Sequence, residues 1–177
     1  MLIYLGNTIL EVELKIDIKT LTRAAAIAAI YVALCLALAP ISYGPLQVRI
    51  SEAMTLLPMI WPEAVMGLTV GALIANMLGP VGIIDVVFGT LATLLAAMIT
   101  YRYRGKFAGY AAPIIINGLI VGGYLPFVYG MPYVALWGID LTVPASMLAV
   151  AAGEAVAVLV LGIPLLGMAK RVGSLQR

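Results

Sequence analysis

Residues 42–58 read SYGPLQVRISEAMTLLP, and they place two charged residues, Arg49 and Glu52, inside an otherwise apolar sequence. Hydrophobic residues make up 64% of the 177-residue chain, charged residues make up only 10%, and the mean hydropathy is +1.13. Ordinary soluble domains carry about 25% charged residues. The composition therefore predicts an integral membrane protein, in which every buried charge needs a physical reason.

Apolar runs need about 20 residues to cross a bilayer, with about 17 to 25 tolerated. Four runs qualify, at residues 21–39, 84–100, 108–128 and 144–168. The run 46–78 is ambiguous, because it could be one kinked crossing or two short crossings that meet at residues 61–63. Pro58 and Pro62 favour two crossings, since proline removes a backbone donor and disfavours helix just before it.

Basic residues decide between the two alternatives, because Lys and Arg concentrate on the cytoplasmic side of membrane helices. They form three clusters: Lys15, Lys19 and Arg23; Arg102, Arg104 and Lys106; Lys170, Arg171 and Arg177. Only two crossings within 46–78 place all three clusters on one side. The sequence thus predicts an all-α membrane protein, a six-transmembrane-helix bundle with both termini cytoplasmic.

The first 20 residues differ from the rest of the chain. Apolar and charged residues alternate over residues 11–19, EVELKIDIK, and this predicts a strand. Gly6-Asn7 could form the turn of a hairpin, although an interfacial leader is an equal alternative. We therefore divide the chain into a leader over 1–20, a six-helix membrane domain over 21–170 and a cytoplasmic tail over 171–177.

Polar residues of the predicted helices gather in the outer half of the bundle: Arg49, Glu52, Asn76, Asp85, Asn117 and Glu154. With a rise of about 1.5 Å per residue, Asn117 and Glu154 lie about 15 Å deep, near the midplane. On the same scale, Glu52 lies about 10 Å below the start of a helix that begins at residue 46. A charged side chain at the bilayer centre costs about 2.5–3.5 kcal/mol. A pocket open to the outside explains these positions best.

Structural roles are alternatives for several of these residues. Arg49 and Glu52, at positions i and i+3, could neutralise each other, and Asn76 and Asp85 could cap helix ends. Glu63 is expected to start a helix at the inner turn. An aromatic belt at the interface would account for Tyr43, Tyr124, Tyr129, Tyr133 and Trp137, and a solvated loop for Asp140. Asn117 and Glu154 are the hardest to explain without a cavity.

Small residues recur at every fourth position of the first predicted helix: Ala25, Ala29, Ala33 and Ala37. They form one smooth face on which another helix can approach closely. The face could pack inside the bundle, or it could dock to a separate membrane subunit.

Several classes of chemistry are poorly supported. The chain has no histidine and one cysteine, Cys35, so a transition-metal site has too few ligands and no metal or cofactor is predicted. No phosphate-binding GxxxxGK[ST] motif occurs, so the chain is not predicted to hydrolyse ATP. A hydrolase would lack its usual histidine base. The net charge of +2 gives no reason to expect nucleic acid as a partner.

Two long stretches, ALAPISYGPLQVRISEAMTLLP (37–58) and PEAVMGLTVGALIANMLGPVGIIDVVFGTLATLLAA (62–97), resemble the QueT family. These proteins are substrate-binding components of energy-coupling-factor transporters for queuosine precursors. The similarity runs from about residue 22 to residue 103, with a weaker match in PIIINGLIVGGYLP (113–126) and around Glu154. The first 20 residues lie outside it.

The resemblance implies a six-helix, multi-pass protein of the cell membrane that binds a 7-deazaguanine such as queuine, preQ1 or preQ0 in an outward-facing pocket. It also implies that the alanine face engages a membrane coupling subunit attached to two ATPases. The candidate substrate-binding residues are Tyr43, Arg49, Glu52, Asn76, Asp85, Asn117, Trp137 and Glu154. A carboxylate would accept the adjacent N–H groups of the base, an amide or guanidinium would donate to its carbonyl, and Tyr43 and Trp137 would supply a stacking platform and lid.

The main alternative is a stand-alone secondary transporter or facilitator of a small polar or aromatic solute. Midplane carboxylates suit such a protein. No inverted repeat is evident, however, and the inner half lacks a polar exit path. An intramembrane enzyme is a weaker third hypothesis.

Overall fold

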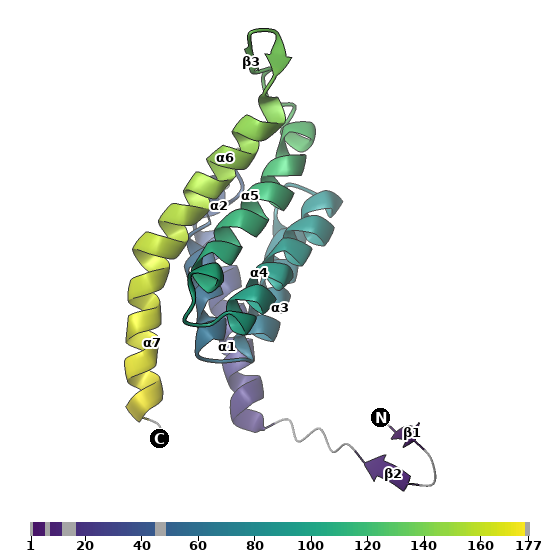
Figure 1. The fold of residues 1–177 in the computed structure, drawn as a ribbon, viewed down its shortest axis with the longest axis vertical. Helices are drawn as coiled ribbons and strands as arrows, with labels where there is room; N and C mark the ends of the chain where they lie inside the picture. The colour runs from purple at the N-terminus through teal and green to yellow at the C-terminus, as the bar shows by residue number, and fades with distance from the viewer. Residues whose placement is uncertain (1, 6–7, 12–16, 45–48, 176–177) are drawn as a thin grey trace.

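The computed structural model describes residues 2–5, 8–11, 17–44 and 49–175. In these residues the protein is all-α apart from two short hairpins, and its helices form one elongated bundle (Figure 1). The elements in chain order are β1 (Leu2–Leu5), β2 (Thr8–Glu11), α1 (Ile18–Ala37), α2 (Ala39–Ser42), η1 (Ile50–Met59), α3 (Ala64–Leu78), η2 (Asp85–Gly89), α4 (Thr90–Arg102), α5 (Phe107–Tyr129), β3 (Ala135–Leu136), β4 (Ile139–Asp140), α6 (Thr142–Ala155), η3 (Val156–Gly162) and α7 (Ile163–Leu175).

Four helical stretches in the described part of the chain are long and apolar enough to cross a membrane: Ile18–Ala37, Asp85–Arg102, Phe107–Tyr129 and Thr142–Arg171. They correspond to the four long runs of the sequence. The last stretch joins α6, η3 and α7 into one bent helix (Figure 1). The protein is therefore an all-α membrane protein with several candidate spans.

The ambiguous run 46–78 divides at the expected place. η1 ends at Met59, a turn follows, and α3 begins at Ala64 with Glu63 at its N-cap position. η1 is a 3₁₀-helix of 10 residues that contains Pro58, and the first described residue before it is Arg49. The prediction that this helix starts at residue 46 and carries Glu52 well below its start was wrong, because Glu52 lies in the first turn of η1.

The N-terminal region contains an antiparallel pair of strands, in which Leu2 pairs with Glu11 and Leu5 with Thr8. The expected turn, Gly6-Asn7, lies outside the described residues, as do residues 12–16 of the predicted strand. The prediction that the strand extends to Lys19 was wrong. Ile18 and Lys19 begin α1, and the Asp17 side chain accepts a hydrogen bond from the Lys19 N–H at 3.3 Å, as N-cap residues do.

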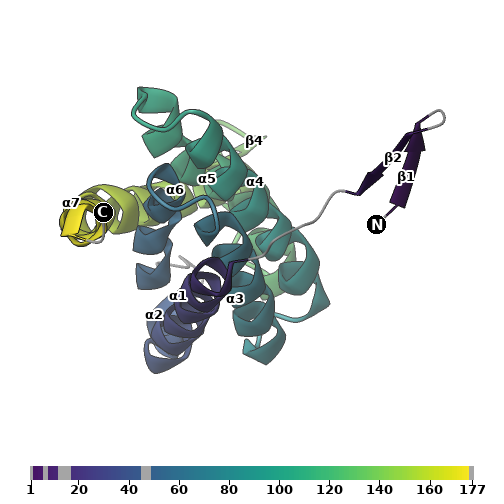
Figure 2. The same cartoon turned by 90° about the horizontal axis from the view of Figure 1, so that it is seen from below.

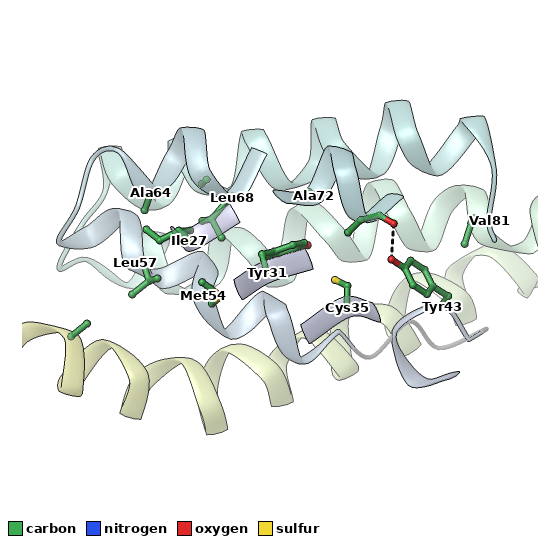
Figure 3. Packing of buried hydrophobic residues seen from close by; sticks show 13 residues of the cluster. Ile27, Tyr31, Cys35, Tyr43, Met54, Leu57, Ala64, Leu68, Ala72 and Val81 are labelled. Carbon is green, nitrogen blue, oxygen red and sulfur yellow. Dashed lines mark hydrogen bonds between the residues drawn. The ribbon is translucent and has the colours of Figure 1, made fainter. Parts of the chain in front are cut away.

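The first layer of the bundle pairs α1 with α3 and η1. Figure 3 shows Tyr31 and Cys35 of α1 among Met54, Leu68 and Ala72, with Tyr43 donating a hydrogen bond to the Ala75 carbonyl at 2.6 Å. At one end of this layer, Arg23 forms an ion pair with Glu63 and its guanidinium lies 4.9 Å from the centre of the Trp61 ring. Apolar packing thus fixes α1, η1 and α3 as one unit.

In a second layer, α5 packs against α6. The view from below shows that α7 stands apart from α1 (Figure 2). Gly122 allows this close packing, because a Cβ there would lie 2.5 Å from the Cα of Met147. α1 begins and α7 ends at the end of the bundle opposite the β3–β4 hairpin (Figure 1). The middle of the bundle, where α5 and α6 face η1, holds the polar residues described next.

Candidate functional site

Twelve polar or charged side chains are buried within the described residues, and six of them are the polar residues predicted from sequence to share the outer half of the bundle. Arg49, Glu52, Asn76, Asp85, Asn117 and Glu154 are each at most 5% exposed. They come from the segment before η1, from η1 itself, and from α3, η2, α5 and α6. Segments distant in sequence therefore converge on one polar region, which divides into two groups.

The first group, here called the arginine cluster, consists of Arg49, Asn76, Asp85 and Tyr124. Arg49 donates from Nη2 to Asp85 Oδ2 at 2.7 Å and from Nη1 to Asn76 Oδ1 at 2.9 Å. Tyr124 donates its hydroxyl to the other carboxylate oxygen of Asp85. Asn76 in turn donates to the Asp85 backbone carbonyl at 3.0 Å. Both oxygens of this carboxylate are therefore occupied, and its charge is compensated by Arg49.

These contacts decide two of the alternatives left open by the sequence. Arg49 pairs with Asp85 on η2, so the interpretation in which it neutralises Glu52 three residues away was wrong. Asn76 and Asp85 do not only cap helix ends, since both contact Arg49. Gly89 makes the arrangement possible, because a Cβ at that position would lie 2.4 Å from Asp85 Oδ1.

The second group, here called the glutamate cluster, consists of Tyr31, Glu52, Asn117 and Glu154. Asn117 Nδ2 donates to Glu154 Oε1 at 2.9 Å and lies 3.4 Å from Glu52 Oε2. Tyr31 donates its hydroxyl to Glu52 Oε1. Two buried carboxylates therefore share a single amide group, and all of their donors in the described residues are neutral.

A small cavity lies against this cluster. It is lined by Arg49, Glu52, Asn117, Val121, Val150 and Glu154, and its volume is about 10 Å³, room for about one water molecule. Two valines thus face a cavity whose other walls are two carboxylates, an amide and a guanidinium. Such a hollow offers acceptors and donors to a small polar molecule and apolar contacts to its faces. No group of three His, Cys, Asp or Glu side chains that could hold a metal ion occurs in the described residues.

The aromatic residues divide between this region and the surface. Tyr43 is buried, and the Arg49 guanidinium lies 5.5 Å from the centre of its ring, but it does not line the cavity. Tyr129 donates its hydroxyl to the Tyr43 carbonyl. Trp137 is 92% exposed, at the turn between β3 and β4 with φ of 52°. The structure therefore brings Tyr43 close to the arginine cluster and leaves Trp137 away from both clusters.

Two site residues were not predicted from sequence. Tyr31 was not considered, and Tyr124 was assigned to an interface belt, yet each donates a hydrogen bond to a carboxylate. The position of each tyrosine within its apolar span could have indicated this role. A tyrosine hydroxyl in the middle of such a span finds no water and needs a protein partner. Tyr31 stands in the middle of α1, which spans Ile18–Ala37.

Two other predicted features lie outside the polar region. Ala25, Ala29, Ala33 and Ala37 are all exposed, so the alternative in which this face packs inside the bundle was wrong. The opposite side of α1 carries the buried residues. Asp140 is exposed on the β3–β4 hairpin, and the pKa of its carboxyl is lowered because it accepts a hydrogen bond from the Thr142 N–H at 2.8 Å.

Apolar spans surrounding a buried polar region define an integral membrane protein that carries charged and amide side chains in its interior. Comparison with known proteins identifies the family. The model of the QueT transporter family matches residues 21–171, and the chain belongs to this family. It is a transporter and not an enzyme.

One similar protein is the "Queuosine precursor transporter QueT" of Lactococcus lactis subsp. cremoris (strain MG1363). The two proteins are 30% identical over 138 residues, which is 69% of this chain and 79% of the relative. No solved structure shows significant similarity to the chain.

Proposed function

We propose that this chain binds a queuosine precursor, a 7-deazaguanine such as queuine, preQ1 or preQ0, and imports it across the cell membrane. The observation that carries the proposal is the cavity whose walls combine Glu52, Glu154, Asn117 and Arg49 with two valines. The name of the Lactococcus lactis relative supports the choice of substrate class.

The chemistry of the cavity walls suits a guanine-like ring. Its adjacent N–H groups form a pair of donors that one carboxylate can accept together, and its carbonyl accepts from an amide or a guanidinium. Val121 and Val150 supply apolar contacts for the faces of the ring. The cavity has room for only about 10 Å³, far below the range of about 300–1,000 Å³ typical of ligand sites, so a bicyclic base enters only when the lining side chains move apart.

We further propose a bundle of six crossings with both termini in the cytoplasm and the cavity facing outward. What supports it is the turn at residues 60–63, which gives η1 and α3 opposite directions, together with the three basic clusters. The ends of α1 and α7 that carry Lys19, Lys170 and Arg171 lie at the same end of the bundle (Figure 1). The β3–β4 hairpin would then be extracellular.

Import is proposed to use a membrane coupling subunit with two ATPase subunits. The exposed alanine face of α1 supports this part of the proposal, because small side chains let a second helix approach closely. Replacing Ala29 by Trp should prevent docking and leave the cavity intact, because Ala29 is on the exposed side of α1 and the buried residues are on the other side. Leu119→Trp on α5 is the matched control, because Leu119 is also exposed, at 54%, but lies on another helix.

The experiment measures ligand binding to the purified protein and uptake by cells that contain or lack the coupling subunits. Wild-type protein should bind the deazaguanines and should support uptake only with the coupling subunits. Ala29→Trp should retain binding and lose uptake, and Leu119→Trp should retain both. Uptake without coupling subunits would identify a stand-alone transporter, and failure to bind any deazaguanine would contradict the proposed substrate.

A further inference from the structure

The three buried carboxylates of the polar region differ in how completely the protein satisfies them. Asp85 receives a cation on one oxygen, from Arg49 at 2.7 Å, and the Tyr124 hydroxyl on the other. Glu52 receives neutral donors on both oxygens, from Tyr31 and Asn117. Within the described residues, Glu154 receives the Asn117 amide at 2.9 Å on Oε1, and its other hydrogen-bonding neighbour is the carboxyl group of Glu52. Glu154 is only 2% exposed, yet its partners are one neutral amide and a second acidic side chain.

The charges of the region are also unbalanced. Arg49 is the one buried basic side chain among the described residues, and Asp85 already occupies it. The glutamate cluster therefore contributes two carboxylates and no cation. A buried charge without a partner is strongly disfavoured, and two like charges close together in a water-poor interior repel each other. In the empty protein the two acids can avoid this repulsion by sharing a proton in the hydrogen bond between them. A positively charged group in the cavity would instead allow both to be ionised.

A second observation, independent of charge, points to the same helix face. Ser146, Val150 and Glu154 are spaced four residues apart on α6, so they lie on one side of the helix, and Val150 and Glu154 line the cavity. Ser146 is buried, and its hydroxyl has no hydrogen-bond partner in the described part of the protein. This face of α6 therefore carries one hydroxyl without a partner and one carboxyl group that meets no cation of its own.

We propose that Glu154 is the specificity-determining residue that binds a protonated amine on the ligand, while Glu52 accepts the N–H edge of the base. This inference rests on the proposed function and narrows it. The preferred substrates are 7-deazaguanines whose substituent at position 7 carries an ammonium group. Neutral members of the class, with a nitrile or a hydroxyl there, should bind more weakly.

The test compares two ligands of nearly equal size and different charge, 7-aminomethyl-7-deazaguanine and 7-hydroxymethyl-7-deazaguanine. Their affinities for the purified full-length protein are measured by titration calorimetry at neutral pH. Wild-type protein should prefer the aminomethyl compound by about tenfold or more, as expected for a buried hydrogen bond between charged groups. Glu154→Gln should reduce the preference to less than about threefold and leave the affinity for the hydroxymethyl compound nearly unchanged.

Asp140→Asn is the matched control, because it removes the same charge from the exposed hairpin outside the cavity. It should leave the ratio of the two affinities as in wild type. Glu154→Asp, which keeps the charge, should retain a preference for the amine. If Glu154→Gln does not fold, the wild-type ratio and the Glu154→Asp ratio still test the inference.

The outcomes separate the inference from the function on which it rests. If neither ligand binds folded wild-type protein, the proposed function fails and the inference fails with it. If both bind with equal affinity, the function survives and the ammonium site is wrong. If the preference disappears in Glu52→Gln and persists in Glu154→Gln, the ammonium is bound by Glu52 and the assignment to Glu154 is wrong.

Discussion

The arginine cluster and the glutamate cluster are neighbouring groups of the same size, yet they are bonded very differently. In the arginine cluster a cation meets an anion, and each side chain has at least one partner on another segment of the chain. In the glutamate cluster two carboxyl groups share one amide. Arg49 connects the two groups, because it pairs with Asp85 and also lines the cavity.

The difference separates a structural use of buried polarity from a binding use. A saturated network fixes the positions of the segments that carry it and has little capacity left for a ligand. An unsaturated group destabilises the empty protein and can recover that free energy when a complementary molecule arrives. We therefore expect matched substitutions in the two clusters to affect different measurements, the free energy of unfolding in one and ligand affinity in the other.

The largest effect is expected for Arg49→Met, which leaves Asp85 buried without its cation. Removing one partner of a buried ion pair costs about 3–5 kcal/mol of stability. The free energy of unfolding in detergent should fall by that amount. The double variant Arg49→Met/Asp85→Leu should be less destabilised than the sum of the two single variants. Additive effects would show that the two side chains do not stabilise each other.

Asparagine occurs once in each cluster, and this allows a matched comparison. Asn117→Ala removes the amide that holds both Glu52 and Glu154 in place and that lines the cavity. The free energy of binding a deazaguanine should therefore weaken by about 2–3 kcal/mol, which is roughly a 30- to 150-fold loss of affinity. Asn76→Ala should instead lower the free energy of unfolding by about 1–3 kcal/mol, because it leaves Arg49 Nη1 without an acceptor. Equal effects on affinity in the two variants would contradict the assignment of a structural role to the arginine cluster and a binding role to the glutamate cluster.

Tyrosine hydroxyls provide a second matched pair. Tyr31→Phe removes a donor from Glu52, and affinity should fall by about 1.5 kcal/mol, roughly tenfold, with a smaller change in unfolding. Tyr124→Phe removes a donor from Asp85, so the main loss of about 1.5 kcal/mol should appear in the free energy of unfolding. Affinity is measured by calorimetry and stability by thermal unfolding for both variants. If Tyr31→Phe mainly lowers stability and Tyr124→Phe mainly lowers affinity, the roles assigned to the two clusters are wrong.

The smallest effects are expected at the two buried serines whose hydroxyls lack partners, Ser42 and Ser146. Ser42→Ala should leave unfolding and affinity within about 0.5 kcal/mol of wild type, because no hydrogen bond is lost. Ser146→Ala should likewise preserve stability, and it should weaken ligand binding by about 0.5–1 kcal/mol if the hydroxyl contacts the ligand. An unchanged affinity would remove Ser146 from the site.

Hydropathy and proline placement predicted the long spans and the turn at residues 60–63, because the length of an apolar run and the geometry of proline are local properties. Depth counting also predicted which polar residues would gather. The partners were not predictable in this way. Arg49 and Asp85 are 36 residues apart in sequence, and their contact depends on how η1 and η2 are rotated against α3.

Local backbone variation explains the remaining differences. The depth of each polar residue in the membrane was estimated from the rise of a regular α-helix, but η1 is a 3₁₀-helix and η2 and η3 are π-helical. The alternating pattern at residues 11–19 overlaps the first two residues of α1, where the Asp17 cap favours helix over strand. Trp137 was predicted to stack on the ligand as part of a platform and lid, whereas it lies at the turn of the β3–β4 hairpin and is 92% exposed.

The π-helical segments carry a consequence for the spacing of the chain. η2 begins at Asp85, and η3 begins two residues after Glu154. A π-turn holds one residue more than an α-turn, so each segment acts as a built-in insertion beside an acidic side chain. Deleting a single residue from 156–162 would restore the α-helical repeat and rotate α7 by about 100° relative to Glu154. The extra residue in η3 therefore sets the direction in which the basic end of α7 points relative to Glu154 in the middle of the bundle.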